Sequence, residues 1–162
     1  RHSYSVAVVM EELARRQEGR DADLWYLTGL LHDLDYELTA DKPERHGHIT
    51  LEMLSGENFA PEGRQAILAH AHPEHAETEL DWGLLAADPT TGFITAVALM
   101  HPSRSLDACE SKRMLKRFRE KAFAKGADRE QMSFCTRLGM DLPEFLELSV
   151  RAMRGIRERL EL

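Results

Sequence analysis

The sequence has few cysteines and no long apolar run. Only two cysteines, Cys109 and Cys135, occur in 162 residues, and no CxxC spacing is present. A disulfide framework or a cysteine-rich zinc site is therefore not expected, and we predict two buried, reduced thiols. No apolar stretch approaches the roughly 20 residues of a membrane helix, and no secretory signal pattern opens the sequence. These absences predict a cytoplasmic protein with no membrane partner.

Positive charge is missing from a long internal stretch. Residues 65–103 contain no Lys or Arg but five acidic residues, whereas residues 112–125 contain seven basic residues and one acid, Glu120. The formal net charge of −7 argues against a general nucleic-acid binder. Two interpretations remain open: a cation site together with an anion site, or two solvated faces. The two regions could also pair between subunits, so a homo-oligomer is left open.

Apolar residues recur mostly at helical spacing, and we find no strand pattern, internal repeat or low-complexity linker. The spacing predicts a first helix over about residues 3–17 and a second helix after Asp21, which is a plausible cap. Prolines and glycines bound the other expected helices: one ends near Gly56, one opens at Pro61, one stops before Pro89, one stops before Pro102, and the last follows Pro143. The expected class is all-α, in a single domain.

The segment LLHDLDYE, residues 30–37, ends an apolar helix in ionisable side chains. Imidazoles and carboxylates without a thiolate suit Mn, Fe, Co, Ni or Zn, with Mg less comfortable beside imidazole. On a regular helix His32 and Asp33 would point about 100° apart, so both can reach one ion only at the helix end. His2 begins the first expected helix and Asp88 ends another, so these elements could converge on one point.

Three segments, RHS at the start, LLHDLDYE and AADPTTGFITAV, resemble the HD-domain superfamily of metal-dependent phosphohydrolases, in particular its small HDIG-type branch. The later HPSRSLDACESKRMLKRFREKAFAKG also resembles the tail of small HDIG-type proteins. The resemblance implies one HD-type helical domain over residues 1–162. Within it we expect the metal site in 1–100, a basic substrate-facing segment in 101–125 and C-terminal packing helices in 128–162. The implied metal ligands are His2, His32, Asp33 and Asp88.

Some branches of the superfamily have two more histidines before the final aspartate and hold two ions. Here ERHGHI offers His46 or His48, and ILAHAHPEH offers His70, His72 or His75; His46 and His70 fit the order best. His70 follows Ile67 by three residues, so it could share the inward face of that helix. The expected cofactor is therefore one or two divalent metal ions. His101, before Pro102, is interpreted as a helix-end histidine with a structural role.

The chain departs from the HDIG pattern at Asp35, which replaces the glycine. Some phosphohydrolases of the superfamily use an acid shortly after the His-Asp pair to orient the attacking water. Asp35 or Glu37 could have that catalytic role, and the alternative is that Asp35 caps or pairs locally.

The basic segment offers candidates for binding substrate phosphate, namely Arg104, Lys112 and Lys116. Lys112 and Lys116 are one helical turn apart and share a face. An arginine can bind phosphate through two parallel hydrogen bonds, and a lysine acts as a point charge. The alternative is an amphipathic helix whose charges only face water.

The predicted activity is hydrolysis of a small phosphate ester, such as a nucleotide or another phosphorylated metabolite, by metal-activated water. Two alternatives belong to other classes. One is an HD-fold diiron oxygenase, which would use a similar set of ligands. The other is a non-catalytic metal- or nucleotide-binding module.

Overall fold

The structure is a computed structural model that describes residues 1–162, and it is all-α, as the sequence predicts. None of its helices combines the length and the apolar character needed to cross a bilayer. The α-helices are α1 (His2–Arg15), α2 (Ala22–Leu31), α3 (Tyr36–Thr39), α4 (His48–Met53), α5 (Pro61–Ala71), α6 (Glu79–Leu99), α7 (Ser111–Arg119), α8 (Arg129–Met132), α9 (Leu142–Arg154) and α10 (Arg157–Leu160). Short 3₁₀ helices are η1 (Pro43–Arg45), η2 (Pro73–His75), η3 (Leu106–Ala108) and η4 (Ser133–Leu138).

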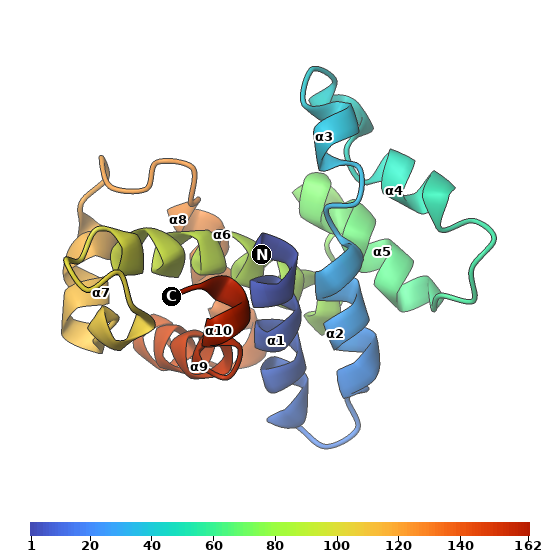
Figure 1. The fold of residues 1–162 in the computed structure, drawn as a ribbon. Coiled ribbons are helices and arrows are strands. Elements are labelled where there is room, and N and C mark those ends of the chain that lie inside the picture. The colour runs from blue at the N-terminus through green and yellow to red at the C-terminus, as the bar shows by residue number, and fades with distance from the viewer.

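α1 and α2 form an antiparallel pair in the middle of the molecule (Figure 1). The carboxylate of Asp21 caps α2 by accepting a hydrogen bond from the backbone N–H of Leu24 at 3.0 Å, as predicted. The two helices approach each other closely at Gly29, where a Cβ atom would lie 2.9 Å from the Cα of Ala7. This close approach fixes the start of α1, with His2, relative to the end of α2.

α6 is one continuous helix of 21 residues with Pro89 inside it. The prediction of one helix that stops before Pro89 and a separate one after it is therefore wrong. A proline inside a helix removes a backbone hydrogen bond and costs about 3 kcal/mol. Buried residues occur on both sides of Pro89 along almost the whole of α6, and this packing outweighs the cost. Asp88 consequently lies in the middle of a helix and not at its end.

α6 connects two groups of helices (Figure 1). α3, α4 and α5 lie near the end where α6 begins, and α7 lies at the end where it finishes. Buried apolar side chains from α1, α6, α7 and α9 form one core cluster. Cys109 and Cys135 are both buried and unpaired in this core, which confirms the prediction of two free thiols.

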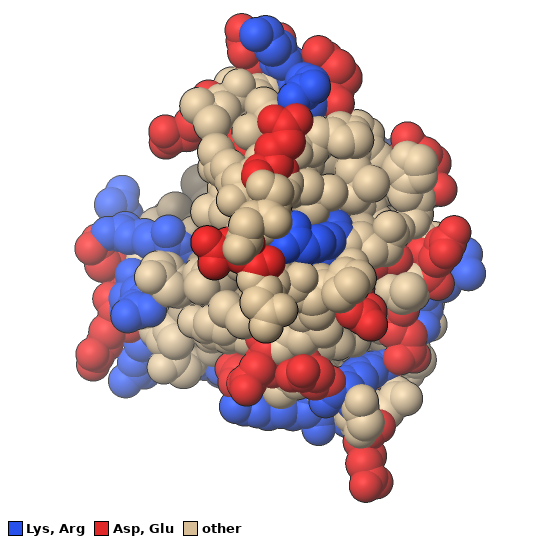
Figure 2. Space-filling model, turned by 90° about the vertical axis from the view of Figure 1, so that its right-hand side faces the viewer, with Lys and Arg blue, Asp and Glu red and all other residues tan.

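Figure 2 shows the face of the molecule that α2, α3, α4 and α5 form. Positive and negative side chains are interspersed over this face, and a positively charged side chain lies near its centre. No concentration of one sign of charge is therefore present on the side of the molecule where α4 and α5 lie.

Candidate metal centre

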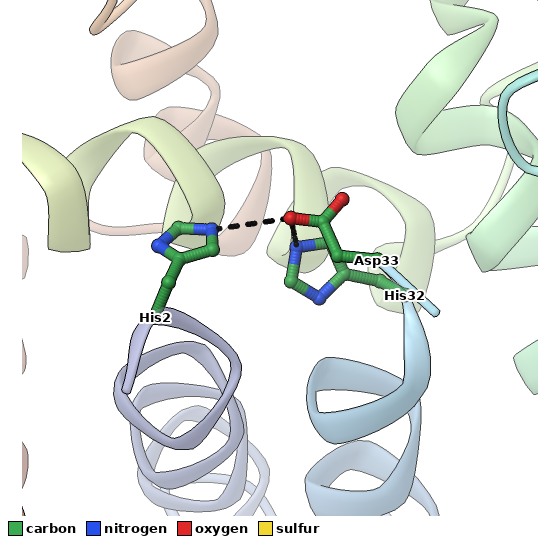
Figure 3. Close-up of side chains that lie close together, drawn as sticks. All are labelled: His2, His32 and Asp33. Carbon is green, nitrogen blue, oxygen red and sulfur yellow. Dashed lines mark ion pairs between the residues drawn. The ribbon is translucent and has the colours of Figure 1, made fainter. Parts of the chain in front are cut away.

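His32 and Asp33 lie just past the last residue of α2, in the turn that joins α2 to α3. At this position the two side chains lie beside each other. Figure 3 shows one carboxylate oxygen of Asp33 turned toward the rings of both His2 and His32. Its Oδ2 lies 3.3 Å from Nε2 of His32 and 3.7 Å from Nε2 of His2.

Asp88 reaches the same group from the middle of α6. Its Oδ1 lies 2.8 Å from Nε2 of His2 and 3.8 Å from Nε2 of His32. The structure thus brings together His2, His32, Asp33 and Asp88, from α1, the end of α2 and α6. These are the four residues that the family resemblance implies as ligands.

Two further histidines face the other oxygen of Asp33. Oδ1 of Asp33 lies 3.4 Å from Nε2 of His46 and 3.6 Å from Nε2 of His70. His46 follows η1, and the next residue, Gly47, has a φ of 77°, a left-handed conformation that glycine adopts without strain. The turn lets the loop approach α5, which contains His70. The two oxygens of Asp33 therefore face different sets of imidazoles.

Backbone and side-chain acceptors fix which nitrogen of each buried ring faces the cluster. Nδ1 of His32 donates to the carbonyl of Gly29 at 2.8 Å, and Nδ1 of His70 donates to the carbonyl of Ile67 at 2.6 Å. In a neutral ring the opposite nitrogen, Nε2, is then an acceptor turned into the cluster. Nε2 of His32 is buried and has no hydrogen-bond partner.

Nε2 of His46 and Nε2 of His70 lie 3.1 Å apart. Both are acceptors when the rings are neutral and Nδ1 carries the proton, so they do not satisfy each other. Buried acceptors without donors are costly, and a cation among them removes the cost. The clustered His and Asp atoms therefore fit a divalent metal ion. Two groups of three residues have ligand atoms close enough to hold one: His2, His32 and Asp33, and Asp33, His46 and His70.

The pKa values also indicate that the cluster carries negative charge that a bound cation would neutralise. Burial alone would lower the pKa of His32, but Asp33 and Asp88 outweigh burial and raise it to about 10. Burial alone would raise the pKa of Asp33 and of Asp88, but hydrogen bonds from the histidines hold both well below the usual range. In His70, burial dominates and lowers the pKa. The two carboxylates thus stay ionised at neutral pH. Their negative charge stabilises either a proton on His32 or a metal ion bound beside it, so the two cations compete for this place.

Asp35 is completely buried beside this cluster. Its Oδ1 accepts a hydrogen bond from Nδ1 of His46 at 2.7 Å, and its Oδ2 accepts one from the backbone N–H of Thr50 at 3.0 Å. Both oxygens are thus occupied within the protein, whereas Glu37 is exposed. This placement favours local pairing of Asp35 over the orientation of an attacking water. A carboxylate behind a histidine is the arrangement that orients many metal-binding imidazoles.

The remaining histidines lie outside the cluster. The ring of His48 packs on the ring of His72 with centroids 5.0 Å apart. Nε2 of His72 donates to the carbonyl of His46 at 3.2 Å. His75 is exposed, and His101 contacts the hydroxyl of Ser103 at 2.8 Å. Among the alternatives left open by the sequence, the structure brings His46 and His70 into the cluster.

The structure does not bring the three basic candidates to the cluster. Lys112 and Lys116 line a cavity that contains none of the clustered residues, and Arg104 lies in an exposed turn with a φ of 47°. The reason is the length of α6, because Leu99 at its end lies about 16 Å along the helix axis from Asp88. We therefore do not assign these residues to a phosphate at the metal centre.

Some groups that shape the cluster were missed by the sequence analysis. The carbonyls of Gly29 and Ile67 each orient the histidine three residues later, and the N–H of Thr50 holds Asp35. The three-residue spacing is a visible signal, because a side chain at the end of a helix can reach the carbonyl one turn back. The contribution of Thr50 has no sequence signal, since it depends on how α4 packs.

Comparison with known proteins identifies one family that this chain matches. Searches of curated proteins and of solved structures returned no significant match. The HD domain family model matches residues 1–133, which is most of the chain and includes every residue of the cluster from His2 to Asp88. The chain therefore belongs to the HD domain family, a superfamily of metal-dependent hydrolases.

Proposed function

We propose that this protein is a metal-dependent phosphohydrolase that acts on a small phosphate ester, with a nucleotide or a related phosphorylated metabolite as the expected substrate. The observation that supports this most strongly is the position of Asp33. Its Oδ2 faces His2 and His32, and its Oδ1 faces His46 and His70. A carboxylate that offers one oxygen to each of two imidazole sets is suited to bridge two neighbouring ions.

In this proposal six side chains would hold the metal. One ion would be held by His2, His32, Asp88 and Oδ2 of Asp33, and a second by His46, His70 and Oδ1 of Asp33. A divalent ion bound there would supply Lewis acidity and make water a nucleophile at neutral pH. The three carboxylate oxygens offset part of the ionic charge, and the carbonyls of Gly29 and Ile67 keep two of the rings in the required tautomer.

Substrate is proposed to enter on the side of His2 and Asp88. These side chains are 41% and 33% exposed, whereas His32 and His70 are almost fully buried. A cavity of about 300 Å³ opens beside them, lined by His2, Asp88, Pro89, Gly92, Ala124, Gly126, Ala127 and Gln131. No Lys or Arg lines this cavity, so the negative charge of a phosphate would be neutralised by metal ions held at the histidine–aspartate cluster. Its size and its small residues favour a small ester.

Metal analysis of the purified protein, followed by a screen for phosphate release with added Mn²⁺, Co²⁺, Ni²⁺, Zn²⁺ or Mg²⁺, tests this function. The substrates would be nucleotides, sugar phosphates and a phosphodiester. We expect metal-dependent release of phosphate by the wild type and at least a hundredfold loss in Asp33→Ala, because both metal positions lose a ligand. His75→Ala, which removes an exposed histidine outside the cluster, is the matched control and should retain activity.

Three results would contradict the proposal. A coloured protein that consumes oxygen and releases no phosphate would favour the diiron oxygenase. Bound metal without turnover of any ester would favour a binding module. Equal metal content in the wild type and Asp33→Ala would exclude the cluster as the metal site.

A further inference from the structure

A large cavity lies away from the metal centre, between the end of α6 and α7. Its volume is about 770 Å³, within the range of pockets that bind small organic ligands. It is lined by Val97, Met100, His101, Pro102, Glu110, Lys112, Arg113, Leu115, Lys116, Arg117 and Arg119. Five of these residues are Lys or Arg and one is acidic, so the cavity is strongly basic in a chain whose net charge is −7.

Helix geometry separates this cavity from the metal centre. Val97 follows Asp88 by nine residues on the same continuous helix. Nine residues correspond to about 13 Å along the axis and about two and a half turns, so the two side chains leave α6 on opposite sides. Figure 1 shows α7 at the far end of α6 from α5, which contains His70. One small ester cannot occupy both places.

Two of the arginines that line the cavity are held by other groups. Arg113 donates to the carbonyl of Ala108 at 2.6 Å. Arg117 pairs with Glu120 at 2.6 Å and lies over the ring of Phe123. These contacts fix one wall of the cavity.

The other three cations are available to a ligand. Lys112, Lys116 and Arg119 follow one another at intervals of four and three residues, so they share one face of α7. All three are exposed, and none has a carboxylate within ion-pair distance. Like charges at this spacing repel one another, and a bound polyanion would relieve the repulsion while binding all three.

The cavity also has an apolar part. Val97 is buried, Leu115 is half-buried, and Met100 is 67% exposed, which is the largest exposure among the large apolar side chains. Methionine is flexible and packs against flat organic groups readily. A lining that combines cations with apolar side chains fits an organic phosphate better than it fits an inorganic anion.

We propose that this basic cavity is a second binding site, separate from the metal centre, for a nucleoside triphosphate. The phosphates would lie along Lys112, Lys116 and Arg119, and the base would contact Met100 and Leu115. The proposal is independent of the proposed hydrolysis, because the cavity contains no residue of the metal cluster.

Calorimetric titration of ATP into the full chain, with metal removed by EDTA, tests the site. We expect binding in the wild type and, with similar affinity, in Asp33→Asn, which disables the metal centre. The double variant Lys112→Glu/Lys116→Glu should bind at least about tenfold more weakly, since it replaces two attractive charges by two repulsive ones. The control Lys121→Glu/Lys125→Glu makes the same charge change outside the cavity and should bind like the wild type.

A second titration distinguishes the contribution of the phosphates from that of the nucleoside. Inorganic tripolyphosphate should bind more weakly than ATP, because it cannot contact the apolar side chains. The proposal is overturned if ATP does not bind the wild type, if Asp33→Asn alone abolishes binding, or if the two double variants weaken binding equally. Circular dichroism of both double variants, expected to match the wild type, shows that a loss of binding is not a loss of folding.

Discussion

His46 donates a hydrogen bond from Nδ1 to the completely buried carboxylate of Asp35, across 2.7 Å. The other oxygen of Asp35 accepts the backbone N–H of Thr50 at the start of α4. Through these two bonds, Asp35 connects the loop of His46 to α4 and fixes which nitrogen of His46 faces Asp33. The residue that departs from the HDIG pattern is therefore placed to position a metal ligand.

Removing this carboxylate should weaken both metal binding and folding. In Asp35→Ala, His46 loses the acceptor that orients its ring, and we expect metal affinity to fall about 10- to 100-fold. Two buried donors lose their partner, which should lower the free energy of unfolding by about 1–3 kcal/mol. Titration with Mn²⁺ and urea denaturation measure the two effects. Glu37→Ala, an exposed acid two residues away, is the control, and equal affinities in the two variants would refute a positioning role for Asp35.

The close contact of α1 and α2 should be needed for the metal centre as well as for the core. In Gly29→Ala the new Cβ would lie 2.9 Å from the Cα of Ala7, so one helix must shift. We expect about 1–3 kcal/mol of destabilisation, together with weaker metal binding, because His2 and His32 sit at the ends of these two helices. The control is Gly56→Ala, where an added Cβ meets nothing within 4 Å. Unchanged metal affinity in Gly29→Ala would show that the cluster tolerates the shift.

The two imidazole sets around Asp33 should hold ions separately. His70→Ala removes a ligand from the position of Oδ1 and leaves His2, His32 and Asp88 intact. We expect metal content after gel filtration to fall from two ions per chain to one, as measured by elemental analysis. His72→Ala should retain both ions, since His72 contacts His46 only through its backbone carbonyl and otherwise packs on the ring of His48, outside the cluster. A wild type with one ion per chain, or a complete loss of metal in His70→Ala, would contradict two separable positions.

The raised pKa of His32 predicts how the stability of the metal-free protein depends on pH. Because Asp33 and Asp88 raise this pKa to about 10, protonated His32 stabilises the fold fully below its ordinary pKa of about 6.5. This contribution is lost as the pH rises through about 10. Metal binding requires the neutral ring, so the stabilisation by metal should grow over the same interval. Thermal melts with EDTA and with Mn²⁺ should therefore diverge as the pH increases.

The control for this pH dependence is His48→Asn, which should melt like the wild type, because His48 lies outside the cluster. His32→Asn should remove most of the dependence in the metal-free protein. If the melting temperatures with and without metal stay parallel between about pH 6.5 and pH 10, proton and metal do not compete for His32.

The all-α class could be predicted from helical spacing, which a single sequence displays. The meeting of His2 with the His32–Asp33 pair was implied by the resemblance to the HD-domain superfamily, which rests on the order of the motif residues along the chain. The break at Pro89 was predicted wrongly, because a local rule about proline was overruled by packing on both sides of α6.

The role of Asp35 could not be decided from the sequence. Its two partners, His46 and Thr50, come from a loop and a helix that approach it only in the folded chain. The choice of His46 over His48, and of His70 over His72 and His75, likewise depends on the packing of α4 and α5. Order along the chain favoured the two residues that the structure brings to Asp33, without excluding the others.

A crystal structure of the protein grown with Mn²⁺ tests most directly whether Asp33 bridges two ions. Anomalous scattering recorded near the manganese edge locates the metal without assumptions about the ligands. We expect two anomalous peaks about 3.5–4 Å apart. One should lie beside Oδ2 of Asp33 with His2, His32 and Asp88, and the other beside Oδ1 with His46 and His70. Manganese bound only elsewhere, for example at His48, His72 and His75, or no peak beside Asp33, would contradict it.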